Sequence, residues 1–444
     1  MPRLRTMDKL GRDTVWMFCA QVLRTALQIV TFVIVARLLG AAQFGVFISV
    51  VAGVSILAPF ASWGTGNLLV KNVARDVDTF GASWGNALIV SLVFGCLLTI
   101  VFALGGSWIF SREVSVFLVV LVCIANLVFS KVTETAVYAF QAVERFGFAT
   151  LVYVLWEFFR LLGAVTLLLF SSSHTAVRWA ELYLFGSVAS ALVALGMVSY
   201  ILGRPRPLFS LFRHDVPQGF YFSSSLSAQT VYNDVDKTML ARLSTSESAG
   251  IYAAAYRLID AASLPISALL YAAYPRFFQK GAEGIQGSLR FAMRLLPRVL
   301  IYAAMASIGL FVIAPTLPRI LGGGYSQMVG GIRLLSLLPL FRTLHYFAGD
   351  TLTSSGHQGW RTLGQGVVVV LNISGNLWLI PHYSWKGAAW VSLASDLLLG
   401  VLLWGLVLVL FARSRDRSTC QLMGGTREDL SRKDLGQIEY SQRS

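Results

Sequence analysis

Long apolar stretches recur along the whole chain, and they constrain the fold more than any other feature of the sequence. A helix needs about 20 mostly apolar residues to cross a bilayer. Breaks at Gly, Pro, Asn and charged clusters separate twelve such stretches, near residues 13–37, 44–70, 81–108, 114–140, 147–170, 178–202, 216–241, 248–275, 291–316, 327–355, 361–381 and 386–411. Only 13% of the 444 residues are charged, against about 25% in soluble domains. The sequence therefore predicts an all-α polytopic membrane protein with about twelve transmembrane helices.

The same composition argues against several classes of protein. The four cysteines offer no disulfide framework, because Cys19, Cys96 and Cys123 lie in apolar runs. The five histidines are scattered without metal-ligand spacing, and no phosphate-binding P-loop or catalytic-serine motif is present. The loops between the spans are short. We therefore expect a non-enzymatic protein without a metal site or a cofactor.

Basic residues gather in alternate loops and indicate the orientation. With the N-terminus in the cytoplasm, the inner segments contain 21 Lys and Arg residues and the outer loops contain six. Basic residues collect on the cytoplasmic side of membrane proteins. The bias predicts that both termini are cytoplasmic. It also accounts for much of the net charge of +14 without a nucleic-acid partner.

A short pattern occurs twice, 205 residues apart. The tripeptides ARL and GVF at residues 36–38 and 45–47 return as ARL and GIY at residues 241–243 and 250–252. Six spans separate the copies, so both halves run through the membrane in the same direction. The sequence predicts two parallel six-helix lobes, a plan in which transporters bind substrate between the lobes. The lobes comprise residues 1–202 and 216–411, with a cytoplasmic linker at 203–215 and a disordered cytoplasmic tail at 412–444.

Sixteen charged residues fall inside the predicted spans. The basic ones are Arg24, Lys131, Arg160, Lys237, Arg257, Arg294, Arg298, Arg333 and Arg342, and the acidic ones are Glu134, Glu157, Asp234, Asp236, Asp260, Asp350 and Asp396. Each charge costs about 2.5–3.5 kcal/mol at a helix centre. These side chains must therefore reach the interface, form pairs or line a water-filled cavity.

Local pairing explains some of these charges. Oppositely charged residues three positions apart share a helix face, as in Lys131/Glu134, Glu157/Arg160, Asp234/Lys237 and Arg257/Asp260. Arg24, Arg333 and Arg342 have no acidic residue at helical spacing. Arg24 lies near the middle of its span, which favours a place in a cavity over a structural pair between helices.

The cationic balance favours a polyanionic ligand such as a pyrophosphate, because guanidinium groups match phosphate oxygens. The substrate-binding candidates are Arg24, Lys237, Arg257, Arg333 and Arg342. The candidates for carrying a coupling ion are Asp236, Asp350 and Asp396. For Asp350 and Asp396 a hydrogen-bonded structural role is the alternative.

An ordered series of motifs runs through residues 8–411. It comprises ARLLG at 36–40, FG at 44–45, KNVAR at 71–75, NDVDK at 233–237, AGIYAAAYR at 249–257, Pro265, YPR at 274–276, GY at 324–325, SGHQ at 355–358, Asn376, IP at 380–381 and KGAA at 386–389. In order and spacing these motifs resemble Wzx-type polysaccharide flippases. Those proteins belong to the multidrug/oligosaccharidyl-lipid/polysaccharide exporter superfamily.

The resemblance implies a function. Such proteins carry undecaprenyl-pyrophosphate-linked glycans from the cytoplasmic to the outer leaflet of the bacterial inner membrane, for O-antigen or exopolysaccharide synthesis. It implies two lobes in a V around a cationic cavity, alternating access, coupling to H⁺ or Na⁺, and association with membrane lipids and the polysaccharide polymerase machinery. Related lipid II flippases use cavity arginines from the first and eighth helices, which are the helices of Arg24 and Arg257 here.

Three other functions compete with this interpretation. An ion-coupled small-molecule or multidrug antiporter of the same superfamily would share the fold, but an acid-rich pocket would be expected in its first lobe. A membrane-bound glycan polymerase or ligase would need a substantial outer loop with catalytic groups, and the outer loops here are short. A purely structural scaffold is the third alternative.

Overall fold

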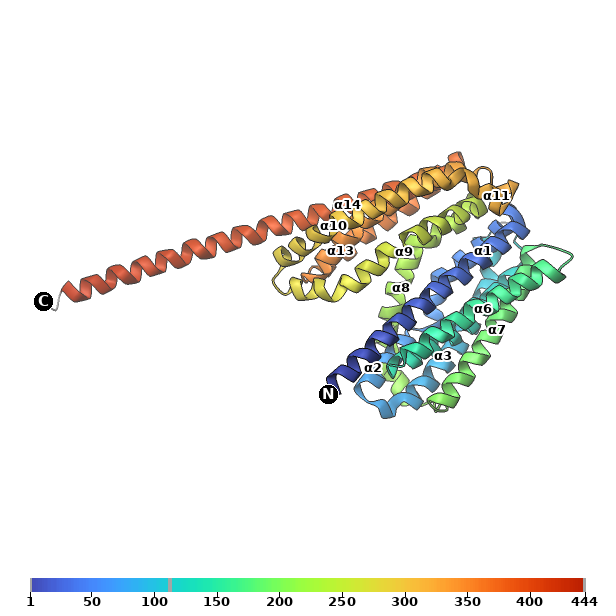
Figure 1. Cartoon of the computed structure of the whole chain (residues 1–444), viewed down its shortest axis with the longest axis horizontal. Helices are drawn as coiled ribbons and strands as arrows, with labels where there is room; N and C mark the ends of the chain where they lie inside the picture. The colour runs from blue at the N-terminus through green and yellow to red at the C-terminus, as the bar shows by residue number, and fades with distance from the viewer. Residues whose placement is uncertain (1, 111–113, 442–444) are drawn as a thin grey trace. The chain divides into compact units, whose positions relative to one another are not determined.

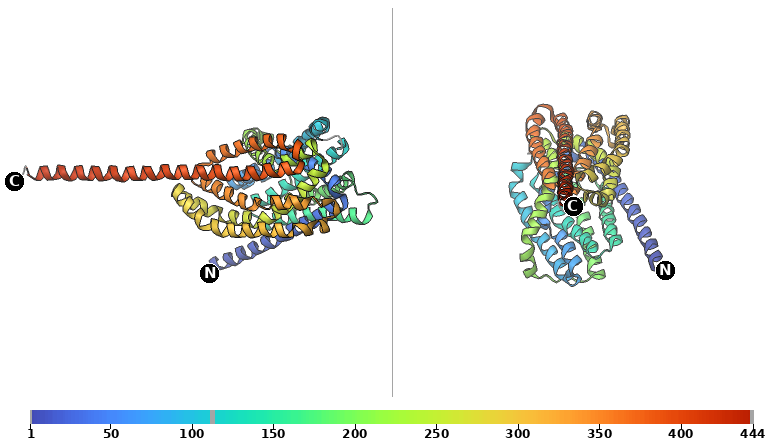
Figure 2. Two further views of the ribbon diagram at one scale, coloured as in Figure 1. Left: turned by 90° about the horizontal axis from the view of Figure 1, so that it is seen from above. Right: turned by 90° about the vertical axis from the view of Figure 1, so that its left-hand side faces the viewer.

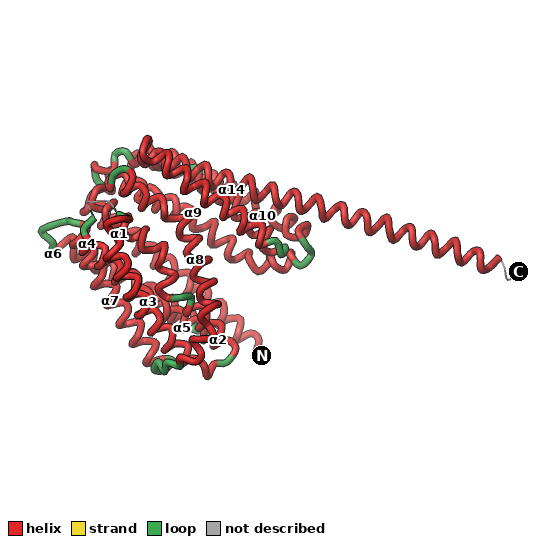
Figure 3. Tube along the Cα trace, turned by 180° about the vertical axis from the view of Figure 1, so that it is seen from behind, coloured by secondary structure: helices red, strands yellow, loops and turns green. Residues whose placement is uncertain are grey.

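The computed structural model describes residues 2–110 and 114–441, and nearly all of them are helical (Figure 3). No residue in these two ranges forms a strand. A chain in lipid must satisfy its backbone hydrogen bonds internally, and an α-helix does so within one segment. The predicted all-α class is confirmed.

The elements follow one another along the chain as shown in Figure 1. The first half contains α1 (Pro2–Ser62), α2 (Thr65–Arg75), η1 (Val77–Thr79), α3 (Phe80–Ile109), α4 (Val116–Cys123), the π-helical η2 (Ile124–Phe129), α5 (Ser130–Ala142), α6 (Phe146–Phe170) and α7 (Ala176–Ile201). The second half contains α8 (Phe209–Leu243), α9 (Ser246–Gly281), α10 (Ile285–Ile313), η3 (Ala314–Thr316), α11 (Leu317–Leu321), η4 (Gly323–Tyr325), α12 (Met328–Leu335), α13 (Leu338–Ser354) and α14 (Gln358–Ser441).

Eight helical segments of the described chain are long and apolar enough to cross a membrane. Two of them, Ala20–Arg75 and Gln358–Ser414, are 56 and 57 residues long, and each is interrupted by a non-helical residue. These residues are Gly40, with φ 67°, and Ser384, with φ 53°. Each segment is therefore long enough for two spans. The more polar α8 and α12–α13 cover the seventh and tenth predicted spans, so the helices are consistent with the twelve predicted.

The helices divide into two compact units. Unit 1 comprises Met1–Arg257, Ile313–Ile332 and Ile373–Ala389, and unit 2 comprises Leu258–Val312, Arg333–Asn372 and Trp390–Ser444. The lobes at 1–202 and 216–411 and the linker at 203–215 stay predictions.

In unit 1, α1 packs against α6 and α8, while α6 packs against α7 and α2 against α5. One apolar core joins α2, α3, α5, α6 and α7, and its largest buried side chains are those of Leu69, Trp84 and Phe140. Burying such side chains contributes about 1.5–3 kcal/mol each in water-soluble proteins. In lipid, close van der Waals packing between helices provides the stabilisation instead. This core fixes α5, which carries Lys131 and Glu134.

In unit 2, α9, α10 and α13 share a second core. Phe277 of α9 and Phe347 of α13 are fully buried, with their ring centroids 6.1 Å apart. Trp404 of α14 donates a hydrogen bond to the Leu344 carbonyl at 3.0 Å, which ties α14 to α13. These contacts hold α13 against α9 and α14.

The two copies of the repeated pattern meet at their glycines. A Cβ atom on Gly45 would lie 1.6 Å from the carbonyl oxygen of Ser246, and one on Gly250 would lie 2.0 Å from that of Ala41. Only glycine permits so close an approach between α1 and α9, as at other small-residue crossings in membranes. The contact is reciprocal, as expected where two equivalent segments meet across a pseudo-two-fold axis. The repeat therefore has a structural counterpart within unit 1.

The chain after residue 411 continues α14 as a helix to Ser441. Figure 2 shows this last part as one continuous helix that runs toward the C-terminal end of the chain. The sequence predicts a disordered cytoplasmic tail for 412–444. The described part of this segment is helical, and the helix meets no proline there. The cytoplasmic placement stays a prediction.

Candidate functional site

A charged network in unit 1 is centred on Glu157 of α6. The Glu157 side chain is only 5% exposed, yet its Oε1 lies 3.6 Å from Arg160 Nη1 and 4.0 Å from Arg24 Nε. Gln28 of α1 donates a hydrogen bond to the same oxygen at 2.7 Å. The predicted Glu157/Arg160 pair is confirmed. Arg24 joins it from another helix, as the inter-helix interpretation predicts, while a place for Arg24 in a cavity stays a prediction.

Aromatic rings hold the two guanidinium groups of this network. Arg24 lies over the ring of Tyr153, 4.2 Å from its centroid, and Arg160 lies 4.7 Å from the centroid of the Trp156 ring. Arg160 also donates to the Tyr183 hydroxyl at 2.7 Å. A cation over an aromatic face is stabilised when water is scarce. The rings thus position both arginines without neutralising them.

The Glu157 network carries more positive than negative charge. Two arginines share one carboxylate, and their side chains keep 26% and 20% exposure while Glu157 is buried. The Nε atoms of Arg24 and Arg160 have no hydrogen-bond partner within the described residues. Guanidinium groups bind phosphate through paired N–H donors. The network is therefore suited to an anionic group.

A second network in unit 1 surrounds Asp236 and Lys237 of α8. The buried Asp236 accepts hydrogen bonds from the Tyr252 hydroxyl and, at 2.8 Å, from the Lys237 backbone N–H. The Lys237 ammonium forms the predicted pair with Asp234, donates to the Asn233 carbonyl at 3.0 Å and lies 5.2 Å from the Tyr256 ring centroid. These bonds engage both predicted candidates. A role for them in binding or coupling stays a prediction.

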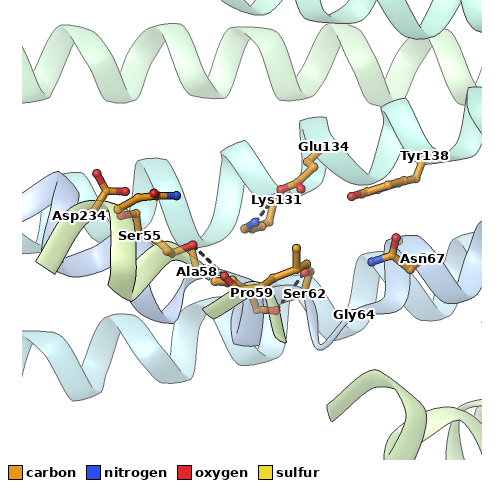
Figure 4. Close-up of a pocket in the computed structure, with 14 residues that line it drawn as sticks. Ser55, Ala58, Pro59, Ser62, Gly64, Asn67, Lys131, Glu134, Tyr138 and Asp234 are labelled. Carbon is orange, nitrogen blue, oxygen red and sulfur yellow. Dashed lines mark hydrogen bonds and ion pairs between the residues drawn. The ribbon is translucent and has the colours of Figure 1, made fainter. Parts of the chain in front are cut away.

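A polar cavity of about 390 Å³ lies beside this second network, entirely within unit 1 (Figure 4). We call it the unit 1 cavity; its lining residues are Ser55, Ala58, Pro59, Ser62, Gly64, Gly66, Asn67, Lys131, Glu134, Tyr138, Leu226, Thr230, Asn233 and Asp234. They come from α1, α2, α5 and α8, and Gly64 comes from the turn between α1 and α2. Lys131 Nζ lies 2.6 Å from Glu134 Oε2, which confirms the predicted pair.

In unit 2, Arg342 of α13 connects two carboxylates from other helices. Its Nη1 lies 2.7 Å from Asp260 Oδ1, and its Nε lies 3.5 Å from Asp396 Oδ2. The nearly buried His345 places Nε2 3.4 Å from the other oxygen of Asp396. Asp396 is therefore paired with two side chains of another helix, α13. The predicted Arg257/Asp260 pair is replaced, because Asp260 meets Arg342 instead.

Asp350 lies on the same helix but has a different partner. Its Oδ1 is 3.5 Å from Arg361 Nη1, and Arg361 also donates to Thr353 Oγ1 at 2.8 Å. A cavity of about 370 Å³ opens beside Asp350 and Tyr346 in unit 2. Arg342, Tyr346 and Asp350 are spaced four residues apart on α13 and share one helix face. Arg342 lies at one end of this face, and Arg361 of α14 contacts Asp350 at the other.

Arg257 and Arg333 are the remaining candidates, and both are exposed. Arg257 lies on α9 in unit 1, and Arg333 lies on α12 in unit 2 with its guanidinium 5.0 Å from the Phe311 ring centroid. Among the residues that the structure describes, no group of three or more His, Cys, Asp or Glu could hold a metal ion.

Several polar residues of these sites escape reasoning from the sequence. His345 stands three residues after Arg342, but its partner Asp396 comes from α14. Arg361, the partner of Asp350, comes from the start of another helix, α14. Asn67 and Thr230, which line the unit 1 cavity, are uncharged residues in predicted spans that contain other polar residues. Only the spacing of His345 from Arg342 offered a signal.

The chain matches a known protein family. Residues 10–280, more than half of the chain, match the family described as "Polysaccharide biosynthesis protein". The chain belongs to this family. The resemblance drawn from the sequence motifs is thereby confirmed.

A relative and two solved structures extend the comparison. A protein of Haloferax volcanii named "Probable low-salt glycan biosynthesis flippase" is 22% identical over 393 residues, which are 86% of this chain and 79% of the relative. An inward-facing multidrug resistance MATE transporter of the MOP superfamily has a TM-score of 0.73 at 14% identity, covering 88% of this chain and 96% of the transporter. The lipid II flippase MurJ, in an inward closed conformation, also has a TM-score of 0.73, at 12% identity, covering 88% and 87%. The chain has the fold of these transporters.

Proposed function

We propose that this polysaccharide biosynthesis protein is a flippase for lipid-linked glycans. Its substrate is an undecaprenyl-pyrophosphate-linked oligosaccharide, which it moves from the cytoplasmic to the outer leaflet for surface polysaccharide synthesis. A charged, hydroxyl-rich headgroup cannot cross hydrocarbon unaided, because every unsatisfied polar group costs kilocalories. A carrier must supply polar partners and counter-charges inside the membrane.

The observation that carries the proposal is the surplus positive charge of the Glu157 network. Two partly exposed arginines share one buried carboxylate in the Glu157 network. In a family member, such a charge is explained by an anion that arrives and leaves. Arg24 and Arg160 are therefore proposed to meet the pyrophosphate.

The other cationic candidates divide by their contacts. Arg257 and Arg333 are exposed, so they are available to the headgroup or to acidic sugars. Lys237 and Arg342 are bonded to carboxylates, so they meet substrate only when these pairs open. We assign the first two to binding and the last two to changes between conformations.

Ion coupling is assigned to the acidic network of unit 2. Arg342 and Arg361 face Asp260, Asp396 and Asp350 in the contacts described above. This set has three carboxylates and two guanidinium groups, and a bound proton or Na⁺ would supply a further positive charge. Asp396 with His345 is thus the preferred coupling site, Asp350 the second and Asp236 the third.

The remaining features are proposed from the family and the orientation. The protein lies in the bacterial cytoplasmic membrane with both termini inside, works by alternating access between two six-helix lobes and uses no cofactor besides a coupling ion. The polymerase machinery is its proposed partner in the membrane.

The alternative is an ion-coupled antiporter of small molecules. One observation favours it, namely that a multidrug transporter matches this fold as well as a lipid II flippase does, with TM-scores of 0.73 for both. The positive surplus around Glu157 is the opposite of what a cation pocket needs.

Complementation tests the proposal. The gene is introduced into strains that each lack a surface-polysaccharide flippase, and surface glycan and efflux of cationic dyes are measured in parallel. Restored surface glycan without dye resistance supports the flippase. Dye resistance without glycan assigns the protein to the antiporters.

A further inference from the structure

The unit 1 cavity exposes its carboxylates more than its lysine to a ligand. In each of its two ion pairs the lysine is more deeply buried than its partner: 13% exposed for Lys131 against 30% for Glu134, and 11% for Lys237 against 30% for Asp234. The carboxylate oxygens of both pairs are therefore the more accessible groups.

The neutral side chains of the cavity add acceptors. The hydroxyl hydrogens of Ser55, Ser62 and Thr230 are donated to backbone carbonyls one helical turn earlier, at 2.8, 3.2 and 3.0 Å. A hydroxyl whose hydrogen is engaged still has oxygen lone pairs to offer. The cavity is thus rich in acceptors on α1 and α8 as well as at its carboxylates.

This pattern does not match a pyrophosphate, which offers only acceptors and carries negative charge. It does match sugar hydroxyls and acetamido N–H groups, which are donors. Asn67 and Asn233 contribute amides that both donate and accept. The acceptor-rich unit 1 cavity and the positive Glu157 network therefore suit different parts of one amphiphilic headgroup.

The cavity also has a flat wall and a suitable size. The ring of Tyr138 lies against α2, where a Cβ atom on Gly66 would come within 2.2 Å of it. Figure 4 shows Tyr138 extending from α5 with its hydroxyl toward the Lys131–Glu134 pair. An aromatic face packs against the apolar face of a pyranose ring. The volume of about 390 Å³ falls in the range of roughly 300–1,000 Å³ of small-ligand sites.

We propose that the unit 1 cavity is a glycan subsite, in which Glu134 and Asp234 accept hydrogen bonds from sugar hydroxyl or acetamido groups beside the Tyr138 ring. This inference rests on the proposed flippase function and adds which residues read the sugar. Binding of the glycan here is separate from binding of the pyrophosphate by arginines.

The test compares a ligand with and without sugar. Full-length protein in lipid nanodiscs is titrated with farnesyl pyrophosphate and with the lipid-linked oligosaccharides extracted from the native cells. Wild-type protein is expected to bind the glycan lipid more tightly. Glu134→Gln and Asp234→Asn each remove one charged acceptor, so each should reduce that preference about tenfold or more while leaving the affinity for farnesyl pyrophosphate unchanged.

The control is a pair of the same geometry outside the cavity. Glu181 of α7 is also 30% exposed and is paired with Arg178 at 2.7 Å three residues earlier. Glu181→Gln should therefore leave both affinities at their wild-type values. If a carboxylate variant fails to fold, Thr230→Val keeps every charge and should lower only the affinity for the glycan lipid.

The outcomes separate the inference from the function on which it rests. A wild-type preference for the glycan lipid that persists in Glu134→Gln, Asp234→Asn and Thr230→Val overturns the subsite and leaves the flippase intact. Wild-type protein that binds neither probe contradicts the proposed function itself. Binding of the cationic dye rhodamine 6G that is lost in Glu134→Gln makes the cavity a cation site and overturns the inference.

Discussion

Replacing Arg342 with methionine is expected to destabilise unit 2 strongly. The substitution removes the cation between Asp260 and Asp396 while keeping a side chain of similar length. Asp396 is only 5% exposed, whereas Asp260 is half-exposed. The penalty therefore falls mainly on Asp396, because Asp260 regains solvent.

The geometry sets the size of the effect. At the 3.5 Å between Arg342 Nε and Asp396 Oδ2, two unit charges attract each other by about 5 kcal/mol at an effective dielectric constant of about 20. Breaking a buried pair by removing one partner costs about 3–5 kcal/mol. Arg342→Met should thus lose about 3–5 kcal/mol of unfolding free energy. Removing both charges in Arg342→Met/Asp396→Asn should recover at least about 2 kcal/mol of it.

The assay is equilibrium unfolding in mixed detergent micelles, followed by tryptophan fluorescence, for wild type, both single variants and the double variant. The double-mutant cycle gives the coupling energy of the pair. A coupling energy below about 0.5 kcal/mol would refute the reasoning, because Arg342 would then not be the counter-charge of Asp396. Substrate binding, which the sequence predicts for Arg342, would then be the better explanation of this residue.

Three further predictions concern export and packing. Arg24→Ala should abolish surface-glycan export while immunoblots show normal protein in the membrane, and an active variant would remove Arg24 from the site. Gly250→Val places a Cβ atom 2.0 Å from the Ala41 carbonyl oxygen and should lower the free energy of unfolding by about 1–3 kcal/mol or more. The control is Gly196→Ala, where a Cβ atom meets nothing within 4 Å, and it should keep the wild-type melting temperature. Equal melting temperatures for the two variants would contradict the close contact between α1 and α9. Asp350→Asn should weaken the dependence of transport on the ion gradient, and unchanged dependence would exclude Asp350 from coupling.

The helices follow from the sequence because the bilayer imposes one simple rule. A span of about 20 apolar residues forms a helix whatever its neighbours are. The predicted spans are accordingly helical in the structure, although the second crosses the break between α1 and α2 and the tenth crosses the break between α12 and α13. Pairs three residues apart, such as Lys131 with Glu134, also follow from helix geometry alone. The repeat predicted at Gly45 and Gly250 appears as a direct contact.

Contacts between helices could not be predicted in the same way. Arg24 meets Glu157, and Arg342 meets Asp260 and Asp396, across helices whose relative rotation no local pattern encodes. The same limit explains why Arg257 was paired with Asp260 and why His345 and Arg361 were overlooked. The unit 1 cavity depends on four helices at once, and a single sequence does not specify how they pack.

The most direct test of the central claim is a flipping assay with purified protein. Proteoliposomes receive fluorescent undecaprenyl-pyrophosphate-linked oligosaccharide in both leaflets, and a membrane-impermeant quencher is added outside. Wild-type protein should let the quencher reach nearly all of the lipid, while Arg24→Ala should leave the inner-leaflet fraction protected as in protein-free vesicles. Wild-type vesicles that protect the inner leaflet as fully as empty ones would contradict the account.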